Sequence, residues 1–200
     1  MTVKWKWILK TMKTKVIGIT GFARSGKDTF YNYSSKILDK ANCTRYAFAD
    51  ALKDECNSFL KDNVGISSFT EDLVDKEFIR PFLVTYGTHL RRKKDPNCWV
   101  KKVERLIQEN ISDSSKNFVF ITDVRFKNEA EWVKSLGGYI FQITRDGFGP
   151  ANEEEHVQSA LIKPLVDFHV MWPTLEENID SCIKYIKPII KKNFREHTSL

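Results

Sequence analysis

The segment from Lys15 to Thr29 constrains the fold of this chain more than any other stretch. Lys15–Thr20 (KVIGIT) is a short apolar run typical of a buried strand, and it is followed by GFARSGKDT over Gly21–Thr29. From Lys27 onward, apolar residues recur at helical spacing. A Gly-x4-Gly-Lys loop between a strand and a helix can wrap backbone N–H groups around phosphate oxygens, and its lysine adds a full positive charge. The segment therefore predicts a phosphate-binding loop.

The loop departs from the common pattern at one position. Asp28 stands after the lysine, where a Ser or Thr hydroxyl usually binds magnesium, and Thr29 follows it. We expect Asp28 to hold the metal through water while Thr29 bonds an inner phosphate, which makes both candidate Mg²⁺ residues. The residues expected to contact ATP are Gly21, Phe22, Ala23, Arg24, Ser25, Gly26, Lys27, Asp28 and Thr29. Such a loop predicts nucleotide binding but does not specify a reaction.

Strand and helix patterns alternate along the rest of the chain. Further strands are expected over 44–49, 118–122, 139–144 and 167–171, and helices over 50–61, 72–92, 97–111 and 128–136. Residues 146–156 are expected to be irregular. Thr174 and Glu177 form a capping-box pair before a C-terminal helix, which Pro188 should kink or end. The alternation predicts an α/β domain of three layers with a mainly parallel sheet.

Charged residues follow several of these strands. Asp123 comes at the end of an apolar strand, Arg125 lies two residues later, and Arg145 ends the next strand. Ligands of parallel sheets bind at the carboxyl ends of the strands, so all three should lie on the rim that carries the phosphate loop. Asp50 follows the second strand, where it either reaches the site or only caps the next helix. Trp99 either stacks on a base or belongs to the core.

Composition excludes several classes of protein. The formal charge is +6, but residues 1–15 carry five lysines and no acid, so the rest of the chain is nearly neutral and offers no sign of a nucleic-acid-binding face. Residues 1–14 are interpreted as a basic extension, either disordered or an over-long start. No run approaches the length of a membrane span. The four cysteines show no metal-ligand spacing, and without a secretory signal a cytoplasmic location is the expectation.

The chain resembles the phage-type deoxynucleoside monophosphate kinases of the P-loop kinase fold. The matching segments are VIGITGFARSGKDT (16–29), YAFADALKDEC (46–56), YGTHLRRKKDPNCWV (86–100), ITDVRFKNEA (121–130) and 137–145. The resemblance implies a five-stranded, mainly parallel sheet with helices on both faces, in a single domain over 15–195. It also implies a helical acceptor-binding region near 63–112 and a short lid near 146–160.

The same resemblance implies that the γ-phosphate of ATP is transferred, with Mg²⁺, to a (deoxy)nucleoside 5′-monophosphate. Lys27, Asp123, Arg125 and Arg145 are then the candidate catalytic residues. The candidate acceptor-binding residues are Asp50, Lys53, Arg80, Arg92, Trp99 and Arg125.

Other functions remain open at the level of sequence. A P-loop kinase acting on another small acceptor, such as dephospho-coenzyme A, would carry the same loop and sheet, and so would a non-catalytic nucleotide-binding protein. For the favoured kinase, the expected partners are small nucleotides without direct contact to nucleic acid or membrane. The expected role is deoxynucleotide supply for DNA synthesis, in the host cytoplasm if the chain comes from a phage. Whether the chain forms a homodimer is left open.

Overall fold

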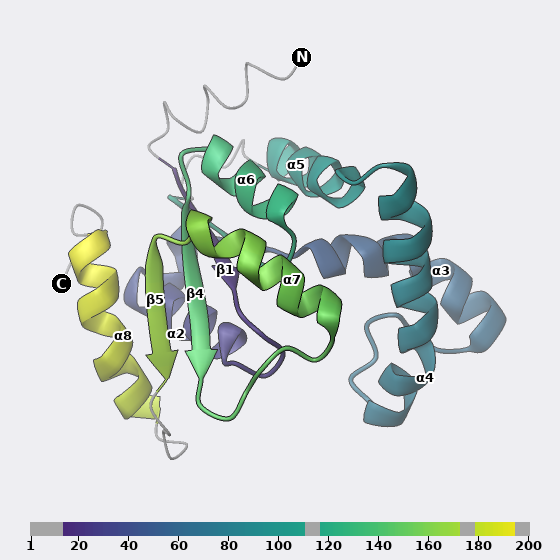
Figure 1. The fold of residues 1–200 in the computed structure, drawn as a ribbon, viewed down its shortest axis with the longest axis horizontal. Coiled ribbons are helices and arrows are strands. Elements are labelled where there is room, and N and C mark those ends of the chain that lie inside the picture. The colour runs from purple at the N-terminus through teal and green to yellow at the C-terminus, as the bar shows by residue number, and fades with distance from the viewer. Residues whose placement is uncertain (1–13, 111–116, 173–178, 195–200) are drawn as a thin grey trace. The chain divides into compact units, whose positions relative to one another are not determined.

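The computed structural model describes residues 14–110, 117–172 and 179–194 (Figure 1). The chain divides into two compact units, Met1–Tyr46 with Ile111–Leu200, and Ala47–Asn110. We call the first the sheet unit and the second the helical unit, and describe each by itself. The expected basic extension over 1–14 lies outside the described residues except for Thr14.

The sheet unit is built on five strands that all run parallel. They are β1 (Lys15–Thr20), β2 (Cys43–Tyr46), β3 (Phe118–Val124), β4 (Tyr139–Arg145) and β5 (Phe168–Trp172). Their order in the sheet is β2-β3-β1-β4-β5, so β1 is central, and its Ile17 pairs with Phe120 on one side and Tyr139 on the other. Nearly every residue of β1 and β3 is buried, as expected for strands covered on both faces. The expected parallel α/β architecture is confirmed.

Helices cover both faces of this sheet. On one face lie α2 (Lys27–Ile37) and α8 (Ile179–Asn193), which pack on each other, and on the other lie α6 (Lys127–Ser135) and α7 (Glu153–Ile162) (Figure 1). Short 3₁₀ turns occupy Lys40–Asn42 and Lys163–Leu165. The core on the α2 and α8 side is rich in aromatic and β-branched side chains, including Ile17, Phe30, Phe141, Ile186, Ile190 and Phe194.

The helical unit contains α3 (Phe48–Val64), α4 (Leu73–Val84), a π-helical segment η2 (Thr85–Arg92) and α5 (Cys98–Asn110). Its core is small, with Cys56, Leu60 and Ile79 buried together. Asp72 caps α4 by accepting hydrogen bonds from the N–H groups of Val74 and Asp75, a contact typically worth about 1 kcal/mol. No described helix of the chain is long and apolar enough to cross a membrane.

Several local expectations need correction. Asp50 does not cap α3, because Ala47 is already extended and the helix begins at Phe48, which places Asp50 inside the first turn. Residues 146–156 are not irregular throughout, because Asn152 accepts a hydrogen bond from the Glu155 N–H and starts α7 at Glu153. Pro188 lies inside α8 and does not end it.

Two further differences concern helix limits. The helix expected over 50–61 runs on to Val64 and ends where Gly65 adopts a left-handed conformation. The helix expected over 72–92 begins at Leu73 and widens into the π-helical segment after Val84. The Thr174 and Glu177 capping pair lies outside the described residues.

Candidate active site

The loop after β1 is wrapped tightly, and its glycines are required by their surroundings. Gly21 and Gly26 have φ of 143° and 92°, in the region that L side chains rarely adopt. A Cβ on Gly21 would lie 2.2 Å from the Ile143 carbonyl oxygen, and one on Gly26 would lie 2.5 Å from the indole nitrogen of Trp172. Gly26 precedes α2 without any side-chain cap, so the first N–H groups of the helix remain available to a bound anion.

Lys27 closes the loop. Its Nζ donates hydrogen bonds to the carbonyl oxygens of Gly21 at 2.8 Å and Phe22 at 2.6 Å. Burial lowers the pKa of the Lys27 ammonium, and the nearby Arg125 guanidinium lowers it further, while Asp28, Glu155 and Asp123 oppose these effects. The ammonium is therefore short of compensating negative charge, as a group that receives a polyphosphate should be.

Two buried polar atoms at the loop have no hydrogen-bond partner in the described structure. The Ser25 side chain is only 1% exposed, and its Oγ lies 2.8 Å from the position of a Cβ on Gly21. The Trp172 indole N–H, next to Gly26, is likewise without a partner. Buried donors of this kind are costly unless a ligand or water satisfies them, so the loop fits a triphosphate.

The magnesium expectation is also compatible with this site. Asp28 is exposed and Thr29 is half-buried in the first turn of α2, so the start of the helix offers a carboxylate and a hydroxyl. Mg²⁺ commonly takes one or two protein oxygens, together with phosphate oxygens and waters. Among the described residues, no cluster of three or more His, Cys, Asp or Glu side chains could hold a metal by itself.

The turn after β3 brings Asp123 and Arg125 to the same rim. Both lie close enough to Lys27 to affect the pKa of its ammonium. The buried carboxylate of Glu129 accepts hydrogen bonds from the backbone N–H groups of Arg125 at 2.8 Å and Phe126 at 3.0 Å, and so fixes this turn. Glu129 belongs to the DVRFKNE run, but its positioning contact was not anticipated from the sequence.

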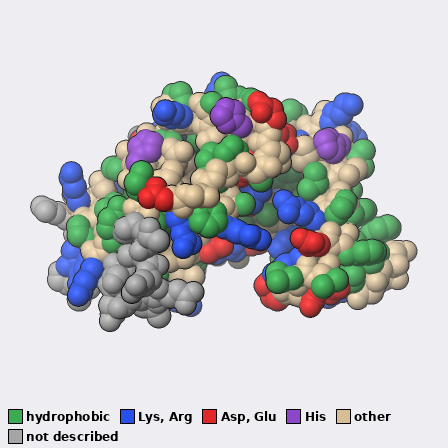
Figure 2. Space-filling model, turned by 60° about the horizontal axis from the view of Figure 1, so that its bottom comes forward, with side chains coloured by type: hydrophobic (Ala, Val, Ile, Leu, Met, Phe, Trp, Pro, Cys, Tyr) green, Lys and Arg blue, Asp and Glu red, His purple; other side chains and the backbone are tan. Residues whose placement is uncertain are grey.

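The region expected to form the lid contributes one group near Lys27, the carboxylate of Glu155. Arg145 ends β4 and its guanidinium lies 5.1 Å from the ring centroid of Phe148. The Glu155 carboxylate of α7 raises the pKa of Lys27 and accepts a hydrogen bond from the Ala151 N–H at 2.7 Å. Figure 2, which turns the carboxyl edge of the sheet toward the viewer, shows Lys and Arg side chains gathered there. Glu155 was not among the expected site residues.

The expected acceptor residues of the helical unit lie on different elements. Asp50 and Lys53 are on α3, Arg80 is on α4 and Arg92 is on η2. Trp99 is only 2% exposed and donates from its indole nitrogen to the Gly87 carbonyl at 3.3 Å, so its ring is part of the core in this structure.

A different cluster does come together in the helical unit. Tyr86 and Arg91 from η2, and Lys102 from α5, meet at the Glu55 carboxylate of α3. These residues are 31 to 47 positions from Glu55 in sequence, and no local pattern connects them.

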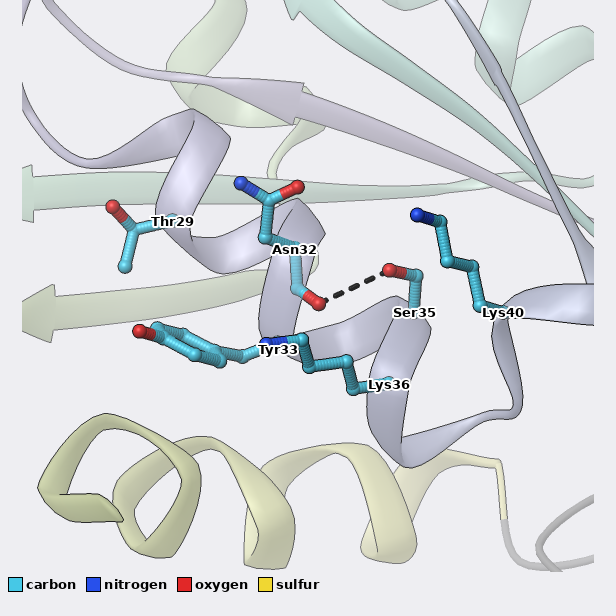
Figure 3. Close-up of a pocket in the computed structure, with 6 residues that line it drawn as sticks. All are labelled: Thr29, Asn32, Tyr33, Ser35, Lys36 and Lys40. Carbon is cyan, nitrogen blue, oxygen red and sulfur yellow. Dashed lines mark hydrogen bonds between the residues drawn. The ribbon is translucent and has the colours of Figure 1, made fainter. Parts of the chain in front are cut away.

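One surface hollow of about 340 Å³ lies along α2 (Figure 3). It is lined by Thr29, Asn32, Tyr33, Ser35, Lys36 and Lys40. Within it the Ser35 hydroxyl donates to the Asn32 carbonyl at 3.1 Å. Of the expected site residues, only Thr29 borders this hollow.

The phosphate loop follows the central strand of a parallel sheet in the order β2-β3-β1-β4-β5. A lysine, carboxylates and an arginine lie together at the carboxyl edge of that sheet. This combination is typical of P-loop kinases that act on small molecules. Residues 19–138 match the family model described as Phosphomevalonate kinase. The chain belongs to this family, within the P-loop nucleoside monophosphate kinase group, and the expectation of a P-loop kinase family is thereby confirmed.

Individual proteins are similar to this chain in sequence or in fold. A protein of Acanthamoeba polyphaga mimivirus, provisionally named a deoxynucleotide monophosphate kinase, is 28% identical over 189 residues, which cover 84% of this chain and 95% of that protein. The crystal structure of TT1252 from Thermus thermophilus shares the fold with a TM-score of 0.51 and 15% identity, over 90% of this chain and 98% of that one. The dephospho-CoA kinase from Campylobacter jejuni gives a TM-score of 0.49 and 17% identity over the same shares.

Proposed function

We propose that this protein transfers the γ-phosphate of ATP to a (deoxy)nucleoside 5′-monophosphate and forms the diphosphate. The observation that carries the proposal is the wrapped loop Gly21–Thr29, in which the ammonium of Lys27 lies near the side chains of Asp123 and Arg125. The similarity to the mimivirus protein over most of both chains supports a deoxynucleotide as acceptor. Such an activity would serve deoxynucleotide supply.

Each residue of the site has a role in this reaction. Phosphoryl transfer asks the protein mainly to position two polyanions and to offset the charge that develops on the transferred group. The loop amides and Lys27 would hold the outer phosphates of ATP, while Arg125 and Arg145 would offset the developing charge. Asp123 would orient the attacking group of the acceptor or help to hold magnesium.

Magnesium fits next to the loop. Asp28 and Thr29 are the residues that would hold it, and when bound the ion would neutralise the charge of the ATP phosphates. The Thr29 hydroxyl also remains able to donate to an inner phosphate.

The helical unit offers the cations that an anionic acceptor requires. Its acidic side chains are concentrated on α3 and around the start of α4, whereas its cations gather in η2 and α5. The cationic side chains from α4 onward are Lys76, Arg80, Arg91, Arg92, Lys93, Lys94, Lys101, Lys102 and Arg105. A doubly charged phosphomonoester is the ligand that such a set favours.

A second acceptor follows from the family itself. The name Phosphomevalonate kinase denotes an acceptor that also carries a phosphate, so the same cations would suit it. The two acceptors differ in the base and sugar, which only the nucleotide brings. An enzyme for nucleotides should therefore prefer some bases over others, whereas an enzyme for phosphomevalonate should phosphorylate phosphomevalonate and no nucleotide.

One assay separates these functions. Purified protein is incubated with ATP and Mg²⁺ and with each of the four deoxynucleoside monophosphates, the four ribonucleotides, phosphomevalonate or dephospho-coenzyme A, and ADP release and product mass are measured. We expect acceptor-dependent ADP release with one or more nucleoside monophosphates. Turnover of phosphomevalonate or dephospho-coenzyme A alone would overturn the nucleotide assignment. ATP binding without turnover of any acceptor would indicate a non-catalytic nucleotide-binding protein.

A further inference from the structure

One carboxylate joins three elements of the helical unit. Glu55 of α3 accepts hydrogen bonds from the Tyr86 hydroxyl at 2.6 Å and from Lys102 Nζ at 2.8 Å. It also accepts one from Arg91 Nη2 at 3.3 Å. Arg91 Nε lies 2.8 Å from the other carboxylate oxygen, an ion-pair distance, although its N–H is not aligned for a hydrogen bond. The contacts hold η2 and α5 against α3.

The π-helical turn beneath this carboxylate is also fixed. A Cβ on Gly87 would lie 2.8 Å from a methyl of Leu52, so α3 packs directly on the backbone of η2. The Gly87 carbonyl accepts the indole N–H of the buried Trp99. The charged groups of Arg91 and Lys102 lie 5.6 Å and 6.0 Å from the centroid of that ring. Turns of this width occur often at functional sites.

The cluster carries more positive than negative charge. Two cations contact one carboxylate directly, which leaves one positive charge in excess among the groups in contact; Asp95 lies farther off, where the charge of Arg91 still helps to lower the pKa of its carboxyl. The side chains of Arg91 and Lys102 are 38% and 32% exposed, against 23% for Glu55, so the cations are more accessible to solvent than the acid that holds them.

The protonation states of the cluster agree with this arrangement. Burial raises the pKa of the Glu55 carboxyl, but the hydrogen bonds from Lys102 and Tyr86 outweigh it and the net pKa is lowered. Glu55 is therefore ionised at neutral pH. The same hydrogen bond raises the pKa of Tyr86 to about 12, so the hydroxyl stays protonated and remains a donor.

We propose that Glu55 is a positioning residue of the acceptor site, which holds Arg91 and Lys102 so that both cations meet the phosphate of the acceptor. The identity of the acceptor rests on the proposed function, whereas the chemistry recognised here is that of any phosphomonoester dianion. The Arg guanidinium is planar and can donate two hydrogen bonds to phosphate oxygens, and the Lys ammonium is a compact charge. Both side chains bind phosphate more tightly when they are already held in place, because less conformational entropy is lost on binding. Glu55 itself touches no reacting atom.

The test uses Glu55→Asp, which shortens the side chain and withdraws the carboxylate from both cations while the net charge of the cluster stays the same. We expect KM for the acceptor to rise roughly fivefold or more, while kcat and KM for ATP stay within about twofold of the parent values. Glu109→Asp, an exposed acid of α5 in the same unit, is the matched control and should leave all three constants unchanged.

A mutant cycle distinguishes positioning from a purely structural role. Because Glu55 is proposed to hold both cations, Glu55→Asp should add little to the acceptor KM of a variant that carries both Arg91→Gln and Lys102→Gln, in which the two residues it positions are already gone. An unchanged acceptor KM in Glu55→Asp, a parallel loss of kcat and ATP affinity, or additivity in the cycle would each overturn the inference. Because every constant is measured with an acceptor that the parent protein uses, this result is independent of which acceptor that is.

Discussion

At the scale of single residues, the candidate site is characterised by the positive charge of Lys27, which the neutral backbone carbonyls around it compensate only in part. In the described structure the Lys27 ammonium donates hydrogen bonds to two carbonyls of its own loop. These neutral acceptors offset its burial only in part, as the lowered pKa of the group shows. A phosphate that replaced them would supply the missing negative charge. We therefore expect the affinity for a triphosphate to depend on this incompletely compensated lysine.

Removing that charge should abolish activity without unfolding the protein. For Lys27→Ala we expect kcat to fall by roughly 10²–10³-fold or more, because the variant lacks the positive charge that stabilises the negative charge of the phosphates during transfer. Circular dichroism should show an unchanged fold. Lys36→Ala, on the same helix but exposed, is the control and should retain activity. Unchanged transfer by Lys27→Ala would contradict the site assignment.

Arg125 is expected to act on the transition state more than on ATP binding. Its side chain is exposed, and its position depends on the hydrogen bonds from the turn to Glu129. Arg125→Ala should lower kcat by roughly 10³-fold, the usual effect of an arginine that offsets charge on the transferred group, while ATP affinity changes little. Lys127→Ala, an exposed cation two residues later, serves as the control. A variant that lost only ATP affinity would place Arg125 with the bound nucleotide instead.

At the scale of elements, the sequence predicted what is local and missed what is distant. The loop from Gly21 to Lys27 was predictable because glycines, lysine, strand and helix are consecutive. The start of α3 at Phe48 was not, since Ala47 carries no capping side chain and Asp50 offered a better signal. The Glu55 cluster was not predictable either, because it exists only after three helices pack together.

Trp172 illustrates an element-scale dependence, because the end of β5 lies against the start of α2. Gly26→Ala should destabilise the protein by about 3 kcal/mol or more and abolish ATP binding, since its Cβ would meet the indole at a left-handed φ. Gly65→Ala is the matched control, with a φ of 74° but open space around its Cβ. Gly65→Ala should lower the free energy of unfolding by only about 1 kcal/mol and leave ATP binding intact. Chemical denaturation and ATP titration measure both quantities, and equal losses in the two variants would contradict the role of the indole.

At the scale of the whole molecule, the two expected ligand sites fall in separate compact units. The phosphate loop and its rim, with Arg125, belong to the sheet unit, whereas the other expected acceptor residues lie in the helical unit. The sequence indicated a helical acceptor region near 63–112, and the helical unit of the structure begins at Ala47. This limit escaped the sequence because α3 follows β2 with only Ala47 between them, so no composition change marks the junction.

This division predicts that each ligand alone protects a different part of the chain from hydrogen exchange. ATP binds the native state only, so it should slow exchange in the loop after β1 and in the turn after β3. A nucleoside monophosphate added alone should slow exchange in η2 and α5, because the cations that we assign to its phosphate lie there. Mass spectrometry of peptides from 15–46 and 117–130 reads the effect of ATP, and peptides from 85–110 read that of the acceptor. Lys27→Ala should lose the first effect while it keeps the second. Protection of 85–110 by ATP alone, to the same extent as by the acceptor, would show that the acceptor phosphate is not what these cations select.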